Sequence, residues 1–165
     1  MIGMAPQVVL VVGLAAAVVT DMRTRRIPNW LTGAIGGAGF GIAFGGGAVT
    51  PVQAALGMLV GLLLLMPGHL IGATGAGDVK LMAVIGILVG PSVVLKAFLY
   101  TAVAGGVFAL AVALRRGMLA DTLYGTQRLV TAPLAAPQAI KSPSRANRFA
   151  YGPAIAVGTL VAVLV

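Results

Sequence analysis

The chain has 165 residues, of which 59% are apolar and 8% are charged, and its mean hydropathy is +1.06. Soluble globular proteins carry roughly 25% charged residues, so this composition indicates an integral membrane protein. The absence of cysteine excludes disulfides, zinc sites built on thiolates and cysteine nucleophiles. The net charge of +8 does not indicate nucleic-acid binding, because the basic residues lie beside hydrophobic segments.

Long apolar runs separated by turn residues predict an all-α, polytopic membrane protein: a bundle of about six transmembrane helices. Gly45-Gly46-Gly47 and Gly90-Pro91 are the clearest stop signals between them. We expect the helices at residues 5–20, 30–44, 52–66, 78–90, 92–114 and 149–165. The helix at 78–90 would be about 20 Å long, shorter than the ~30 Å hydrocarbon core, so Asp78 is expected below the headgroup level.

The polar interval at 115–148 is expected to be a cytoplasmic loop. Met118, Leu119, Leu123, Leu129 and Val130 recur in it with roughly helical spacing, which predicts a short amphipathic helix at the membrane surface. No internal repeat and no soluble segment is visible. We therefore expect residues 1–165 to form a single transmembrane domain.

Acidic residues are rare in this chain. There are three, Asp21, Asp78 and Asp121, and no glutamate. Asp21 ends the first apolar run, just before a basic turn. Asp78 follows Gly75-Ala76-Gly77 at the start of another apolar run. Because an ionisable group at membrane depth is costly, two acids at segment ends indicate chemistry.

Positive charge predicts the orientation of these segments. The intervals after the first, third and fifth helices hold ten of the eleven basic residues, and the other side holds only Lys96. Such a bias predicts that the side with the ten basic residues faces the cytoplasm and that both termini lie outside. Asp21 and Asp78 are then expected on the same, cytoplasmic face. The ten residues are Arg23, Arg25, Arg26, Lys80, Arg115, Arg116, Arg128, Lys141, Arg145 and Arg148.

Two carboxylates on one face are what hydrolysis by an aspartyl dyad requires. Because like charges a few ångströms apart do not both ionise easily, one remains protonated while the other activates water. A purely structural role is the competing interpretation of Asp78, since aspartate is a common helix N-cap. A small cation channel or a proton-coupled transporter that uses both acids is the alternative function.

These residues also carry a family resemblance. Asp21 with Arg26-Ile27-Pro28-Asn29, followed by Gly75-Ala76-Gly77-Asp78-Val79-Lys80, resembles the prepilin peptidases, also called type IV leader peptidases, which are GxGD-type intramembrane aspartyl proteases. The Phe149–Pro153 stretch is similar to that family's late Gly-Pro motif. The resemblance implies that Asp21 and Asp78 are the catalytic acids. It also implies that the protein cleaves the short basic leader of type IV pilin-like precursors at the cytoplasmic face of the bacterial inner membrane.

The larger family members carry an amino-terminal segment with paired CxxC motifs, which is associated with N-methylation of the mature pilin. This sequence has no cysteine, so no methyltransferase activity is expected. It resembles the short, peptidase-only branch that serves Flp-type, tight-adherence pili. Archaeal preflagellin peptidases share the dyad and remain an alternative.

Around the two acids, a supporting role is expected for Gly75, Gly77, Lys80, Arg26, Pro28 and Asn29. The glycines permit close approach of a substrate or helix, and Lys80 either extends to the headgroups or favours an ionised carboxylate. No cofactor and no metal is expected, since one histidine, His69, and no cysteine leave a metal without ligands. The expected partners are pilin-like precursors and membrane lipid, and not nucleic acid.

Overall fold

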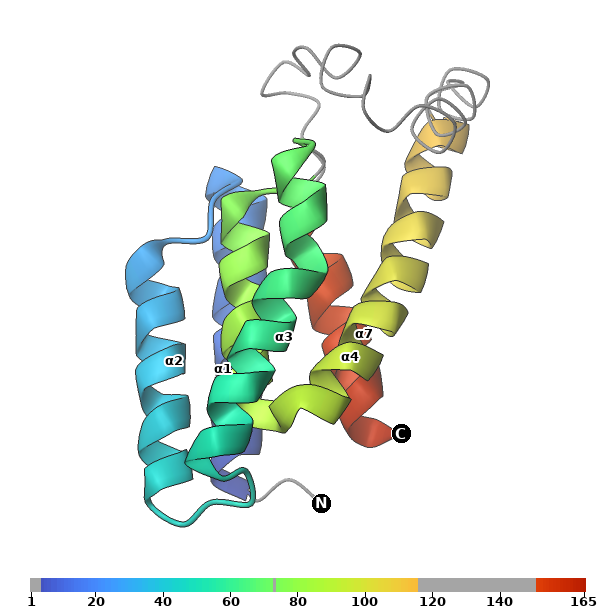
Figure 1. Ribbon diagram of the computed structural model, residues 1–165. Helices are drawn as coiled ribbons and strands as arrows, with labels where there is room; N and C mark the ends of the chain where they lie inside the picture. The colour runs from blue at the N-terminus through green and yellow to red at the C-terminus, as the bar shows by residue number, and fades with distance from the viewer. Residues whose placement is uncertain (1–3, 73, 116–150) are drawn as a thin grey trace.

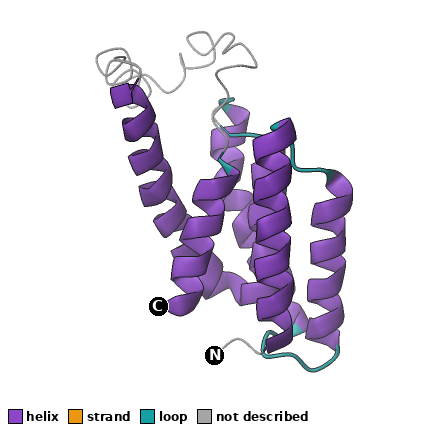
Figure 2. Ribbon diagram, turned by 180° about the vertical axis from the view of Figure 1, so that it is seen from behind, coloured by secondary structure: helices purple, strands orange, loops and turns teal. Residues whose placement is uncertain are grey.

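The computed structural model describes residues 4–72, 74–115 and 151–165, and all of its regular structure there is helical (Figures 1 and 2). The all-α prediction is therefore confirmed for these residues. The amphipathic helix expected near residues 118–130 lies outside them. The helices are α1 (Met4–Thr24), α2 (Asn29–Phe44), α3 (Pro51–Leu70), α4 (Ala76–Arg115) and α7 (Gly152–Leu164).

Three of these helices are long and apolar enough to cross a membrane: α1, α3 and the 76–111 stretch of α4. Their exposed side chains include many valines and leucines, which is the surface expected to face lipid. Together these features support a membrane protein. The count of about six crossings stays a prediction, because α2 and α7, at 16 and 13 residues, fall short of the ~20 residues of a typical span.

A break divides α4 into two halves. Gly90 has φ 78° and ψ 174°, a conformation that glycine adopts readily, and Pro91 follows it. In Figure 1 the first half of α4 runs through the bundle away from the Asp78 end, and the second half turns back toward that end. The break coincides with the predicted stop, although the helical hydrogen bonding is otherwise continuous.

The predicted helix ends are wrong at two places near the aspartates. The first helix was expected to end at residue 20 but continues to Thr24, so Asp21 lies in its last turn. The third was expected to end at residue 66 but continues to Leu70 with Pro67 inside it. The extension of α3 is stabilised because the Ile71 N–H donates to the Pro67 carbonyl at 3.2 Å, and the Thr74 hydroxyl donates to the Leu65 carbonyl at 3.3 Å.

The first half of α4 is the centre of the bundle. Every residue from 81 to 90 is buried. The α4 helix as a whole packs against α1, α2, α3 and α7. The α3–α4 contact is closest where Gly57 meets Gly86: a Cβ built on either glycine would overlap the carbonyl of the other. Small residues at such crossings let helix backbones approach within van der Waals contact. This packing fixes the position of the residues that begin α4, Asp78 among them.

Candidate active site

Asp21 lies in the last turn of α1 and is only 6% exposed. Its Oδ2 accepts a 3.0 Å hydrogen bond from the main-chain N–H of Gly152, which begins α7. A Cβ on residue 152 would lie 2.7 Å from that oxygen. Glycine at this position therefore gives the carboxylate access to a main-chain donor at the start of a helix, where N–H groups have no partner within the helix.

Asp78 lies in the first turn of α4 and is 9% exposed. Its Oδ2 accepts a 3.1 Å hydrogen bond from the N–H of Gly75, the residue before the helix. An acidic side chain that reaches back to this N–H makes half of a capping box. The structural interpretation of Asp78 is thus partly correct, because it does cap α4. Capping uses one oxygen of the carboxyl group and leaves the other for chemistry.

The two carboxyl groups lie at one end of the bundle. There α1 ends, and α4 and α7 begin (Figure 1). Both side chains are nearly buried there, at 6% and 9% exposure. Two carboxyl groups that share a proton are the arrangement that acid–base hydrolysis requires.

The turn after α1 packs onto the turn before α4. Ile27, 7% exposed, lies against Gly77: a Cβ on residue 77 would be 3.2 Å from the Cβ of Ile27. The Lys80 ammonium donates a 2.9 Å hydrogen bond to Oδ1 of Asn29 at the start of α2. The two sequence motifs are therefore in direct contact, and that contact fixes the end of α1 relative to the start of α4.

The remaining predicted residues take different places. Pro28 precedes α2 in an extended conformation, and its carbonyl accepts from the N–H groups of Leu31 and Thr32. The Arg26 side chain is exposed, and its carbonyl accepts a 3.1 Å hydrogen bond from the Thr24 hydroxyl. Lys80 is exposed, and within the described residues no ion pair joins it to either aspartate, so both roles expected for Lys80 stay predictions.

A model of the type IV leader peptidase family matches residues 8–110, which is more than half of the chain and includes both aspartates. The chain belongs to the type IV leader peptidase family. The family predicted from the motifs is thereby confirmed, and the protein is a membrane peptidase. No curated protein and no solved structure matches the chain significantly.

Two residues that contact this end of the leader peptidase lie beyond the matched range. Gly152 holds Asp21, and Tyr151 precedes it and is within electrostatic reach of Asp78. Sequence reasoning did not place either at the site. The Gly-Pro pair at residues 152 and 153 was a signal for a helix start, but nothing in it indicates which carboxylate the free N–H would meet.

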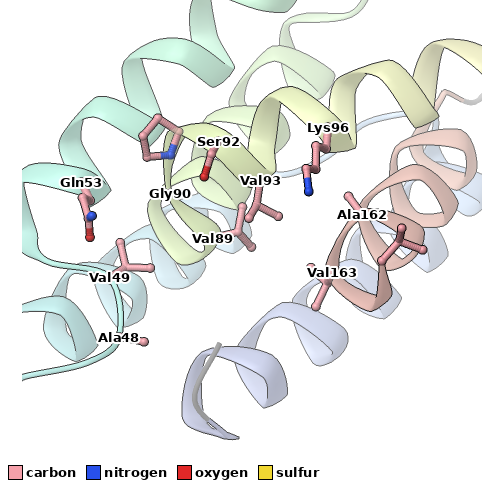
Figure 3. Close-up of a pocket in the computed structure, with 12 residues that line it drawn as sticks. Ala48, Val49, Gln53, Val89, Gly90, Ser92, Val93, Lys96, Ala162 and Val163 are labelled. Atoms are coloured by element: carbon pink, nitrogen blue, oxygen red, sulfur yellow. The ribbon is translucent and has the colours of Figure 1, made fainter. Parts of the chain in front are cut away.

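A cavity of about 370 Å³ lies at the opposite end of the peptidase, around the Gly90 break (Figure 3). Its polar lining comes mainly from Gln53, Ser92 and Lys96, and no acidic residue lines it. Among the described residues no cluster of three metal-ligating side chains occurs anywhere. The cavity therefore lacks the carboxylates that a hydrolytic dyad needs, and the candidate active site is the Asp21–Asp78 end.

Proposed function

We propose that this leader peptidase is an aspartic endopeptidase that removes the short basic leader from type IV pilin-like precursors, with Asp21 and Asp78 as its catalytic acids. The observation that carries the proposal is the presence of two nearly buried carboxyl groups, each held by a main-chain N–H, at one end of an apolar helical bundle. Groups so withdrawn from water are costly unless they have a use.

In the proposed reaction one carboxylate takes a proton from water, whose oxygen attacks the carbon of the scissile peptide. The protonated partner gives its proton to the carbonyl oxygen, and a tetrahedral gem-diol forms. A proton then passes to the peptide nitrogen, the C–N bond breaks, and an acid and an amine are released. The main-chain donors at Gly152 and Gly75 hold one oxygen of each carboxyl group and leave the other for these transfers.

The reaction is expected at the cytoplasmic face of the bacterial inner membrane. At the aspartate end the described residues include Arg23, Arg25, Arg26 and Lys80, whereas Lys96 lies at the other end by the cavity. Positive charge favours the cytoplasmic side, so both chain termini would lie outside. Precursors of the Flp type are the proposed substrates, in line with the resemblance of the motifs.

The test is cleavage of a purified pilin-like precursor by the purified, detergent-solubilised peptidase. Asp21→Asn and Asp78→Asn should each abolish cleavage, because the amide keeps the size of the side chain but does not exchange protons. Asp121→Asn, the third acid, should retain activity and is the matched control. Cleavage by either dyad variant at a rate near that of the unaltered protein would overturn the assignment.

Comparison of Flp-type precursors with other type IV pilin precursors and with archaeal preflagellins would identify the substrate class. Absence of cleavage in all of them, together with a cation flux in proteoliposomes that depends on Asp21 and Asp78, would favour a channel or transporter instead.

A further inference from the structure

Tyr151 is held at the aspartate end by a contact that depends on a glycine. A Cβ on Gly105, in the second half of α4, would lie 2.8 Å from the phenolic oxygen of Tyr151 and 2.9 Å from its Cε2. The tyrosine ring can therefore lie against α4 only because residue 105 has no side chain. This contact fixes the phenol end of the side chain, and the hydrogen bond from the next residue, Gly152, to Asp21 fixes the backbone beside it.

The contact places Tyr151 at the aspartate end of the bundle. The residue after it, Gly152, donates its main-chain N–H to Asp21. The second half of α4, which carries Gly105, turns back toward the end at which α4 begins (Figure 1). Asp78, in the first turn of α4, lies near enough for its charge to act on the Tyr151 phenol.

The chemistry of the phenol suits a hydrogen-bond donor. The ordinary pKa of a tyrosine phenol is about 10, well above neutral pH. The hydroxyl is thus neutral, with its proton, throughout the range in which a peptidase works. The side chain is only half-buried, so it retains a surface for contact with a bound peptide.

Peptide hydrolysis makes the carbonyl oxygen more negative as water adds to the carbon, and a positioned donor stabilises that change. We propose that the Tyr151 hydroxyl donates a hydrogen bond to the carbonyl oxygen of the scissile peptide of the precursor, which makes Tyr151 a third catalytic residue. This inference rests on the proposed peptidase function. It concerns a residue outside the 8–110 range that the family model matches.

The test measures kcat and KM for precursor cleavage by Tyr151→Phe, which removes only the hydroxyl oxygen. Loss of one such donor lowers kcat by about 10²-fold or more, and KM should change much less. Tyr100→Phe, a partly buried tyrosine of α4 without a hydrogen-bonded partner in the described structure, is the matched control and should keep its activity. The thermal unfolding midpoint of both variants should stay at the unaltered value.

A second pair of variants moves the ring and keeps the hydroxyl. Gly105→Ala places a Cβ where the phenol lies and should also lower kcat, whereas Gly106→Ala, with open space around it, should not. This pair decides the matter if Tyr151→Phe fails to fold. Unchanged kcat in folded Tyr151→Phe or in Gly105→Ala would overturn the role of Tyr151 and leave the proposed function intact. An inactive unaltered protein would instead contradict the proposed function.

A pH profile separates donation from packing. Fluorinated tyrosine at position 151 keeps the ring and hydroxyl but ionises at lower pH. If the phenol must stay protonated, the enzyme loses activity as the pH rises through the pKa of the phenol. With fluorinated tyrosine, the alkaline loss of kcat should therefore move to lower pH. Of the charged groups in the described residues, Asp78 of α4 acts on the phenol, and Asp21 of α1 accepts a hydrogen bond from the main-chain N–H of the next residue, Gly152. An alkaline limb that does not move would contradict donation by Tyr151.

Discussion

Gly152 donates its main-chain N–H to Asp21 Oδ2 at 3.0 Å, across 131 positions of sequence. This bond joins the last turn of α1 to the first residue of α7 inside the bundle, where both partners are buried. A hydrogen bond to a charged group is worth about 1.5–3 kcal/mol. It therefore orients the carboxyl group that the proposed mechanism requires, and it brings the end of the chain into the site.

The first prediction is that Gly152→Ala lowers the cleavage rate by about ten- to a hundredfold, the equivalent of one hydrogen bond to a charged group. Its Cβ would lie 2.7 Å from Oδ2 and 3.1 Å from the Cβ of Asp21, so the carboxyl group must move. Steady-state cleavage of precursor is the measurement. Gly37→Ala on α2, which meets nothing within 4 Å, is the control, and an equal rate for both variants would show that this bond does not orient Asp21.

The second prediction concerns the stability of the bundle. Gly86→Val should lower the free energy of unfolding by at least about 1–3 kcal/mol, because its side chain would enter the backbone of α3 at Gly57. Thermal unfolding in detergent, followed by circular dichroism, would measure it. Gly106→Val, on the exposed part of the same helix, should leave the midpoint close to the unaltered value. Equal midpoints would mean that the α3–α4 contact is looser than the structure has it.

The third prediction assigns a modest role to the Lys80–Asn29 hydrogen bond. It is exposed, and exposed polar pairs contribute less than about 1 kcal/mol, so Lys80→Met should reduce cleavage less than tenfold. A double-mutant cycle with Asn29→Ala should show that the two effects are not additive. Additive losses, or complete loss of activity in Lys80→Met alone, would instead favour a direct action of the ammonium group on the dyad.

Local sequence predicted the elements that depend on local signals. The apolar runs predicted helices, and Gly90-Pro91 predicted the break in α4, because backbone conformation there is determined by the residues themselves. The end of α3 was missed since Pro67 is a stop signal in isolation. There the hydroxyl of Thr74, nine positions from Leu65, supplies a hydrogen bond to the helix end that no local pattern contains.

The residues of the candidate site also fall into those that local sequence predicted and those that it did not. Asp21 and Asp78 could be identified from their rarity and their neighbours. The cap that Asp78 forms with Gly75 is local and was an open interpretation of the sequence, whereas the contacts of Gly152 and Ile27 could not be predicted, because they join segments distant in the chain. A glycine selected for close approach resembles any other glycine among the 24 in this sequence. Only the fold shows which neighbouring residue occupies the space that a side chain at such a glycine would fill.

The last prediction tests orientation. The end that holds Asp21 carries Arg23 and its basic neighbours, whereas the α2–α3 loop at residues 45–50 contains no charge, so the aspartate end is expected to face the cytoplasm. The chain has no cysteine, and single cysteines can therefore be introduced without background. Thr24→Cys and Ala48→Cys are suitable, because both positions are exposed and neither has the positive φ found at Gly46.

A membrane-impermeant thiol reagent added to intact cells should modify Ala48→Cys and spare Thr24→Cys. After the membrane is permeabilised both should react, which shows that position 24 is accessible and was protected only by its side of the membrane. Labelling of Thr24→Cys in intact cells would place the aspartates on the outer face. The precursor would then have to cross the membrane before cleavage, and the proposed cytoplasmic reaction would be wrong even if the dyad assignment held.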